Sequence, residues 1–184
     1  GDASSEADDY YVQYVSNTTS QGYWKETVRQ THDTYVTHST LPWKLVREAN
    51  GTFTFTPNSW EGRTVGDFDS APDPSFIGRK INDVFFHRNR LGFISDENVI
   101  LSRSGSYFKF YPETVTTVLD TDPIDVAVSH TKVSILRHAI PFNETLLLFS
   151  DQTQFMLSAG DSLTPATVSI NQTTEYESSL QAEP

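Results

Sequence analysis

Residues 91–102 read LGFISDENVILS, and residues 147–158 read LLFSDQTQFMLS. Each stretch contains an apolar strand, a Ser-Asp pair that opens a turn, a second apolar strand and a closing serine, with Gly105 or Gly160 shortly after it. The two Ser-Asp pairs lie about 55 residues apart, close to the roughly 50-residue period of large propeller blades. A hairpin of this kind cannot bury its apolar face alone, so the repeat predicts sheets that stack on one another.

Further strands extend each copy into a four-stranded unit. The first unit is expected to contain strands at 83–87, 91–95, 99–103 and 107–110, and the second at 124–128 or 133–137, 145–150, 154–158 and 167–170. Four antiparallel strands per repeat are typical of a propeller blade. We therefore predict an all-β antiparallel fold in which residues 71–184 hold two propeller-type blades, roughly 83–111 and 124–170. The alternative is a β-sandwich made from the same two sheets.

Residues 1–70 are expected to form a hairpin-rich β segment that precedes the blades. Residues 10–15 and 24–29 are rich in aromatic and β-branched side chains and predict one pair of strands. Residues 43–47 and 52–56 flank Asn50-Gly51, which predicts a type I′ turn because both residues tolerate positive φ. The chain is rich in Pro, Gly and Asp from residue 57 to 82, which predicts an irregular connection and the domain boundary.

The composition narrows the class of protein. The 184 residues carry 24 acidic and 13 basic side chains, a formal net charge of −11, and no cysteine, which excludes disulfides and thiolate metal sites. No apolar run is long enough to span a membrane. The sequence opens on Gly1 without a methionine, so we expect an internal segment of a longer protein. Because tight phosphate binding needs clustered cations, the acidic balance argues against a protein that grips DNA, although DNA could slide past such a surface.

The candidates for metal binding and catalysis have simpler interpretations. Asp120, Asp122 and Asp125 resemble a calcium loop in charge but lack the spacing of an EF-hand, so we favour a turn in which the carboxylates cap backbone groups. Asp96 and Glu97 are adjacent on a hairpin tip and are expected to be solvated rather than to act as a general acid and base. The five histidines show no metal-ligand spacing. We therefore predict no cofactor, no metal and no catalytic residue.

Arginines near the first repeat are the candidate structural residues. Several guanidinium groups in one short stretch can hold loops to carboxylates through bidentate bonds, at a subunit or domain interface. The full set of candidate structural or interface residues is Arg79, Arg88, Arg90, Asp83, Asp120, Asp122 and Asp125.

Several strings carry a resemblance to one family. They are DDYYV at 8–12, WKET at 24–27, LVR at 45–47, PSFIGR at 74–79, NDVFFHRNRLGF at 82–93, LDTDPID at 119–125 and LFSDQTQF at 148–155. Together they resemble the nozzle proteins, or tail tubular proteins B, of short-tailed double-stranded DNA phages. The resemblance runs from about residue 1 to 177 and departs at 34–40, where no family string is found.

The resemblance implies a structural role. Nozzle proteins form a sixfold ring below the tail adaptor, next to the tail fibres, and line the DNA exit channel with longer chains that carry a β-propeller. It implies a virion tail protein made in the bacterial host cytoplasm, with no catalytic residues and with DNA passing without sequence-specific binding. The alternative function is a carbohydrate-binding or glycan-hydrolysing β-domain for host recognition. A third is a secreted binding module, suggested by four Asn-x-Ser/Thr sequons, at Asn17, Asn50, Asn143 and Asn171.

Overall fold

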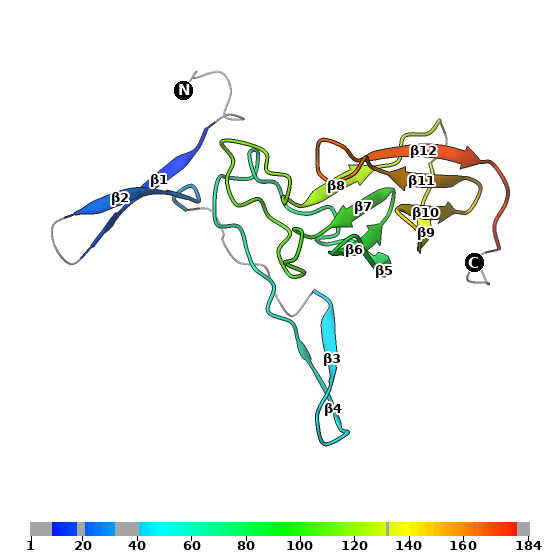
Figure 1. Ribbon diagram of the computed structural model, residues 1–184, viewed down its shortest axis with the longest axis horizontal. Coiled ribbons are helices and arrows are strands. Elements are labelled where there is room, and N and C mark those ends of the chain that lie inside the picture. The colour runs from blue at the N-terminus through cyan, green and yellow to red at the C-terminus, as the bar shows by residue number, and fades with distance from the viewer. Residues whose placement is uncertain (1–8, 18–20, 32–40, 132, 180–184) are drawn as a thin grey trace.

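The computed structural model describes residues 9–17, 21–31, 41–131 and 133–179, and all regular structure within these ranges is β-strand (Figure 1). The strands are β1 (Tyr11–Ser16), β2 (Gly22–Thr27), β3 (Trp43–Arg47), β4 (Phe53–Pro57), β5 (Ile81–His87), β6 (Arg90–Ser95), β7 (Asn98–Leu101), β8 (Ile124–Ala127), β9 (Leu136–Phe142), β10 (Thr145–Ser150), β11 (Gln154–Ser158) and β12 (Ser169–Thr174). The predicted departure from the family at 34–40 lies outside the described residues.

The repeated sequence forms two equivalent hairpins. β6–β7 and β10–β11 are antiparallel pairs at the centres of two four-stranded sheets, ordered β5-β6-β7-β8 and β12-β11-β10-β9. In the first copy, Asp96 and Glu97 separate the paired residues Ser95 and Asn98. In the second copy four residues separate the last paired residues, Phe149 and Gln154, and the Ser150 N–H and hydroxyl both donate to the Thr153 carbonyl. The all-β antiparallel fold is confirmed, and both a propeller-type and a sandwich arrangement are compatible with it.

The two sheets share one apolar core. Alternate side chains of the repeated hairpins enter it, and Ile94, Leu101, Leu146 and Leu157 are fully enclosed. Because side chains alternate between the two faces of a strand, this pattern follows directly from the period-two hydrophobicity of the repeat. The opposite face of the β5–β8 sheet is covered by an aromatic cluster of Trp60, Phe76, Phe93 and Phe110, whose ring centroids lie 5.1 to 6.0 Å apart.

The fourth strand of the first sheet differs from the prediction. We expected residues 107–110, but β8 (Ile124–Ala127) pairs with β7, with Ile124 opposite Leu101. Residues 103–109 form a tight turn instead, closed by a bond from the Arg103 N–H to the Lys109 carbonyl. Phe110 leaves this turn for the aromatic cluster, while Ile124 completes the core between the sheets, so burial decides which segment pairs. Residues 124–127 therefore belong to the first sheet, where we had expected them to open the second, while the division of the chain near residue 70 and the limits of the two blades stay predictions.

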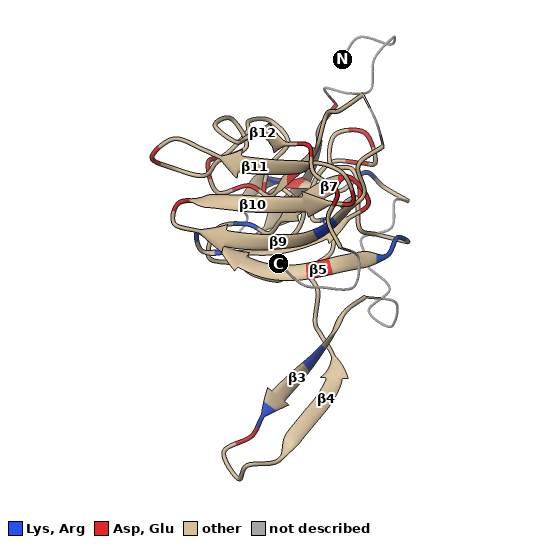
Figure 2. Ribbon diagram, turned by 90° about the vertical axis from the view of Figure 1, so that its right-hand side faces the viewer, with Lys and Arg blue, Asp and Glu red and all other residues tan. Residues whose placement is uncertain are grey.

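β5 and β9 lie side by side where the two sheets meet (Figure 2). The Asp83 carboxylate accepts a hydrogen bond from the Ala139 N–H at 2.8 Å, and the Asn82 amide donates to the Leu136 carbonyl at 2.8 Å. The Leu136 N–H in turn donates to the Asp96 carbonyl at 2.8 Å. Two side-chain bonds and one backbone bond therefore join the two sheets here, although the sheets share no backbone ladder.

We expect Asp83→Ala to lower the free energy of unfolding by about 1–2 kcal/mol, because the buried Ala139 N–H loses its acceptor. Thermal unfolding gives the total loss, and hydrogen exchange at the Ala139 amide should accelerate. Glu61→Ala is the matched control, since it removes a carboxylate from an exposed pair with Lys109. Equal effects of the two substitutions would contradict the role of Asp83.

Two hairpins project from the body as separate arms. β1–β2 and β3–β4 are each isolated two-stranded sheets, and Figure 1 shows them extending in different directions. The β3–β4 hairpin is confirmed, but its turn is not type I′. Ala49, Asn50 and Gly51 form a three-residue loop in which only Gly51, at φ 85°, is left-handed. Asn50 uses its side-chain oxygen to accept the Thr52 N–H at 3.0 Å, which holds it in an ordinary conformation.

Candidate assembly surfaces

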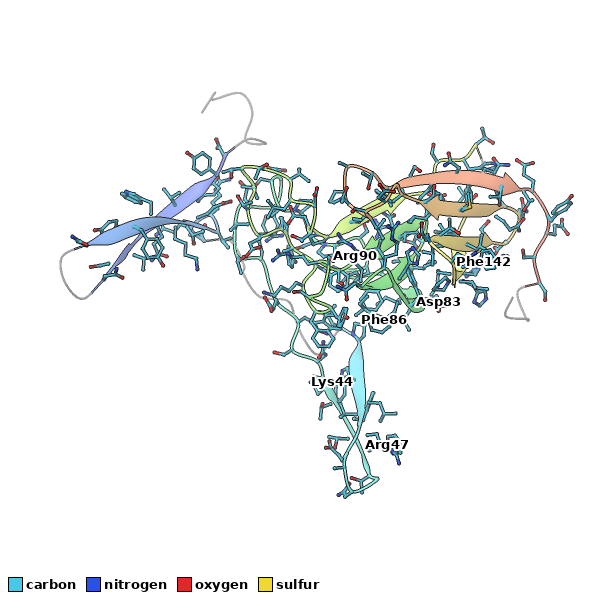
Figure 3. All side chains as sticks on the ribbon, in the orientation of Figure 1. Lys44, Arg47, Asp83, Phe86, Arg90 and Phe142 are labelled. Atoms are coloured by element: carbon cyan, nitrogen blue, oxygen red, sulfur yellow. The ribbon has the colours of Figure 1, made fainter. Side chains whose placement is uncertain are left out.

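Arg90 is the most completely bonded of the predicted residues. Its side chain is buried, and its guanidinium donates to the carbonyls of Ser102 (2.8 Å), Asp122 (2.6 Å), Asp120 (2.9 Å) and Leu163 (3.0 Å). Burial lowers the pKa of Arg90, and the nearby Asp122 carboxylate opposes that shift. The four carbonyls come from the end of β7, the loop before β8 and the loop after β11, so one guanidinium ties both sheets together (Figure 3).

Arg88 reaches the same loop from the other side of a tight turn. Arg88 and Asn89 both have positive φ, 45° and 62°, as a two-residue hairpin between β5 and β6 requires. The Arg88 guanidinium donates to the Gly160 carbonyl at 3.1 Å and to the Asp161 carbonyl. We expected Arg88 and Arg90 to bind carboxylates. Both instead donate to backbone carbonyls, because the fold places loop carbonyls rather than acidic side chains next to their guanidinium groups.

The other predicted residues do not gather at one place. Arg79 pairs with Asp96 at 3.0 Å in an exposed contact, and Asp83 bonds to β9. Asp122 accepts the Leu119 N–H at 2.8 Å, and Asp125 accepts the Ser75 N–H at 2.7 Å. These bonds fit the turn-capping interpretation of the Asp120–Asp125 segment. Within the described residues, no three His, Cys, Asp or Glu side chains come close enough to hold a metal ion.

Asp67 anchors the β1–β2 arm to the body, a role that the sequence analysis did not identify. It accepts a hydrogen bond from the Tyr11 hydroxyl at 3.1 Å and lies 3.9 Å from the Arg29 guanidinium. Burial alone would raise the pKa of Asp67, but hydrogen bonds from the Ser70 N–H and hydroxyl and from the Asp69 N–H outweigh burial and lower that pKa to about 2.

The depressed pKa of Asp67 predicts an acid-sensitive contact. Its contribution to stability is complete above the unfolded pKa of about 4 and is lost as the pH falls toward 2. We expect the melting temperature of the wild type to fall through this window. Asp67→Asn should melt lower than the wild type at neutral pH, and the difference between the two should shrink as the pH approaches 2. A constant difference from pH 7 to 2 would contradict this assignment.

Both arms carry uncovered apolar side chains. On β1–β2, Tyr14 and Trp24 lie directly opposite each other with ring centroids 5.4 Å apart. On β3–β4, Trp43 and Phe55 share a face, with centroids 5.1 Å apart. Alternation in the sequence indicates which residues share a face, but nothing in it says that the face is left bare. The bare faces of the two arms are therefore visible only in the structure.

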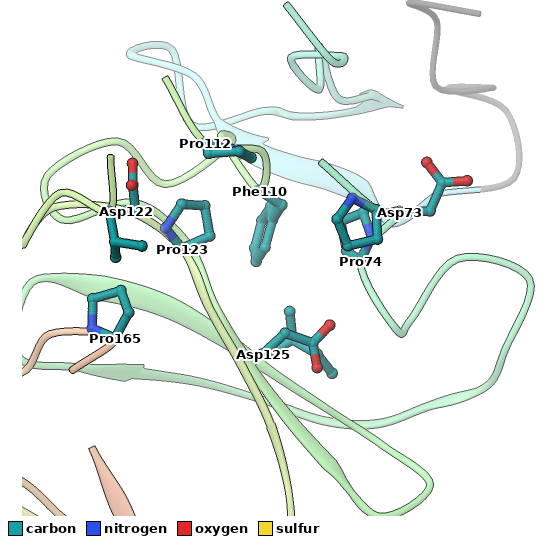
Figure 4. Close-up of a pocket in the computed structure, with 11 residues that line it drawn as sticks. Asp73, Pro74, Phe110, Pro112, Asp122, Pro123, Asp125 and Pro165 are labelled. Carbon is teal, nitrogen blue, oxygen red and sulfur yellow. The ribbon is translucent and has the colours of Figure 1, made fainter. Parts of the chain in front are cut away.

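The body carries a proline-rich pocket of about 270 Å³ at the loops between β7 and β8 (Figure 4). Its apolar lining includes Phe110, Val118 and five prolines, at positions 72, 74, 112, 123 and 165. Asp73 and Asp125, both exposed, lie at its rim. It has the apolar walls and few polar groups of a binding pocket, and it holds no pair of free carboxylates of the kind a glycosidase uses.

Comparison with known proteins identifies the protein family of this chain. A family model for bacteriophage nozzle proteins matches residues 1–184. The chain belongs to the bacteriophage nozzle protein family. Tail tubular protein gp12 of Escherichia phage T7 is 47% identical over 184 residues, which cover 100% of this chain and 23% of that relative. The chain thus spans under a quarter of the length of the relative that it matches.

Family membership confirms the resemblance found in the sequence. It makes the nozzle chain a structural, non-enzymatic component of the phage tail. Of the residues that the structure describes, none form a helix that is long and apolar enough to cross a membrane.

Proposed function

We propose that this nozzle chain forms part of the wall of a ring-shaped channel that conducts DNA out of the virion. The observation that carries the proposal is the match of the nozzle family model to the whole chain. A wall needs rigid units, and the shared core with its buried Arg90 tie makes the two sheets one rigid unit.

The charge of the chain supports passage rather than retention of DNA. The formal net charge is −11, and acidic residues lie in loops around the body (Figure 2). Phosphates bind proteins mainly through clustered Lys and Arg, and Arg88 and Arg90 are already used within the fold. DNA would therefore transit without sequence-specific contacts.

The partners that follow from this proposal are tail proteins. The chain would assemble with copies of itself, with sixfold symmetry, and would contact the tail adaptor protein and the tail fibres. It would be made in the host cytoplasm and function in the virion tail. T7 gp12, the relative described above, is named as a tail tubular protein.

Native mass spectrometry and electron microscopy of the full-length protein test the proposal. We expect a sixfold ring with an open channel, and no retention of double-stranded DNA on the protein at physiological salt. A protein that stays monomeric at micromolar concentration, alone and with its adaptor, would overturn the ring.

Carbohydrate binding is the second candidate, because exposed rings such as Tyr14 and Trp24 can stack on sugars. A glycan array probed with the full-length protein separates the two. Specific glycan binding that is lost on Trp24→Ala would favour the second candidate. If the protein binds no glycan and forms a ring, the nozzle wall remains as the proposed function.

A further inference from the structure

The β3–β4 arm has one apolar face that is largely exposed, although Trp43 and Phe55 at its base line a pocket together with Arg79 and Ile81. The register places Trp43, Leu45, Phe53 and Phe55 on this face, and they are 45%, 64%, 62% and 64% exposed. The opposite face carries polar side chains such as Thr54, whose hydroxyl donates to Glu48 at 2.8 Å. The arm is therefore amphipathic, with its apolar side bare.

A bare arm of this kind is not stable by its own packing. An isolated two-stranded hairpin is marginal in water at best, and a contiguous exposed apolar patch on a soluble protein marks an interaction site. The Trp43 and Phe55 rings already contact each other, and the three-residue loop at Gly51 sets the register. This ordering lowers the entropy that docking would cost.

The charge of the arm points to an acidic partner. Residues 43–57 carry Lys44 and Arg47 against Glu48, so the arm is positive within a chain whose net charge is −11. Figure 3 shows both on the projecting arm, with Lys44 near its base and Arg47 nearer its tip. Arg47 lies opposite Phe53 and shares the apolar face. A partner surface should therefore combine apolar walls with exposed carboxylates.

The proline-rich pocket on the body has this chemistry. It joins apolar walls to the exposed carboxylate of Asp125, whereas Asp73 at the same rim is already paired with Arg63 at 2.7 Å. Val118, at one side, is 71% exposed, so a substitution there removes little buried surface. No residue of the arm lines this pocket, and Figure 1 shows the arm pointing away from the body.

We propose that the β3–β4 arm of one copy docks its apolar face on the proline-rich pocket of another copy of this chain. The apolar side chains would fill the pocket while Arg47 faces the Asp125 carboxylate at its rim. This inference rests on the proposed ring, for which it supplies a contact between subunits. Charge complementarity between the arm and the body of the same protein is the reason to choose a second copy as the occupant.

Introduced cysteines test the contact directly, because residues 1–184 contain none of their own. Full-length Leu45→Cys protein is mixed with full-length Val118→Cys protein and oxidised gently, so that a disulfide between these sites can only join two copies. We expect a disulfide-linked dimer at a yield at least tenfold above that of a control mixture with Thr54→Cys, which lies on the polar face of the same arm. Equal yields from both faces, or rings that form with no link, would overturn the proposal.

A charge swap tests the same contact without cysteines. Arg47→Glu and Val118→Lys should each raise the concentration needed for half-assembly about tenfold, and the double variant should restore it, since each tenfold step is about 1.4 kcal/mol. No rescue would overturn the pairing.

If Arg47→Glu lowers the melting temperature of the monomer and leaves assembly unchanged, the arm folds back on its own chain. If it instead abolishes binding to lipid vesicles, the arm contacts membrane. If the wild-type protein forms no ring, that result contradicts the proposed function itself, independently of the arm contact.

Discussion

Arg90→Met is expected to lower the free energy of unfolding by about 4 kcal/mol or to prevent folding. The substitution keeps an unbranched apolar stem but leaves the carbonyls of Ser102, Asp120, Asp122 and Leu163 without their shared donor. An unsatisfied buried polar group costs about 1–3 kcal/mol, and breaking a buried charged network costs about 3–5 kcal/mol. Chemical denaturation measured by tryptophan fluorescence reports the loss.

The matched control for this experiment is Arg79→Met. Arg79 makes an exposed pair with Asp96, and its loss should cost under about 1 kcal/mol. Arg90→Lys should behave nearly as badly as Arg90→Met, because a compact ammonium group cannot span four carbonyls that a planar guanidinium reaches at once. Full rescue by lysine, or a loss equal to that of the control, would contradict the tie between the two sheets.

Gly92→Val is expected to destabilise the protein by about 3 kcal/mol through overpacking. Gly92 pairs with Phe85 across the β5–β6 ladder, and a Cβ at position 92 would overlap the Phe85 ring. Phe85 is only 6% exposed within the core, so its ring has no free space to enter. The φ of Gly92 is not left-handed, so its backbone conformation does not require glycine. Glycine is needed at this position because the Phe85 ring approaches so closely.

A double-mutant cycle checks the cause. Phe85→Ala alone should cost about 3–5 kcal/mol by leaving a cavity. In that background Gly92→Val should cost far less than it does alone, because the added methyl groups enter the vacated space. Additive losses in the two substitutions would show that Gly92 acts through something other than the Phe85 ring.

The repeated hairpins were predictable because their signal is local. Alternating apolar residues on both sides of a Ser-Asp turn define β6–β7 and β10–β11 wherever the rest of the chain lies. The fourth strand of the first sheet was not predictable in this way. Residues 107–110 and 124–127 have similar β-forming composition, and the choice depended on which one the core could bury.

For the candidate residues, too, part of their role could be predicted from the sequence and part could not. The clustering of arginines in the sequence indicated that Arg88 and Arg90 hold the structure together. Their acceptors could not be identified, because a backbone carbonyl such as that of Leu163 leaves no mark in the side-chain sequence. Asp67 was passed over because its low pKa depends on hydrogen bonds from a local turn and from the distant Tyr11.

The antiparallel β-structure, the doubled hairpin, the acidic charge and the resemblance to nozzle proteins could all be derived from the residues alone, since they depend on residue identity and short-range period. Packing in the folded protein sets what covers each strand. It buried both faces of the β5–β8 sheet, gave Arg90 its four carbonyls and left the apolar face of the β3–β4 arm bare. The reason is that period tells which side chains share a face, whereas burial depends on segments that are distant in the chain.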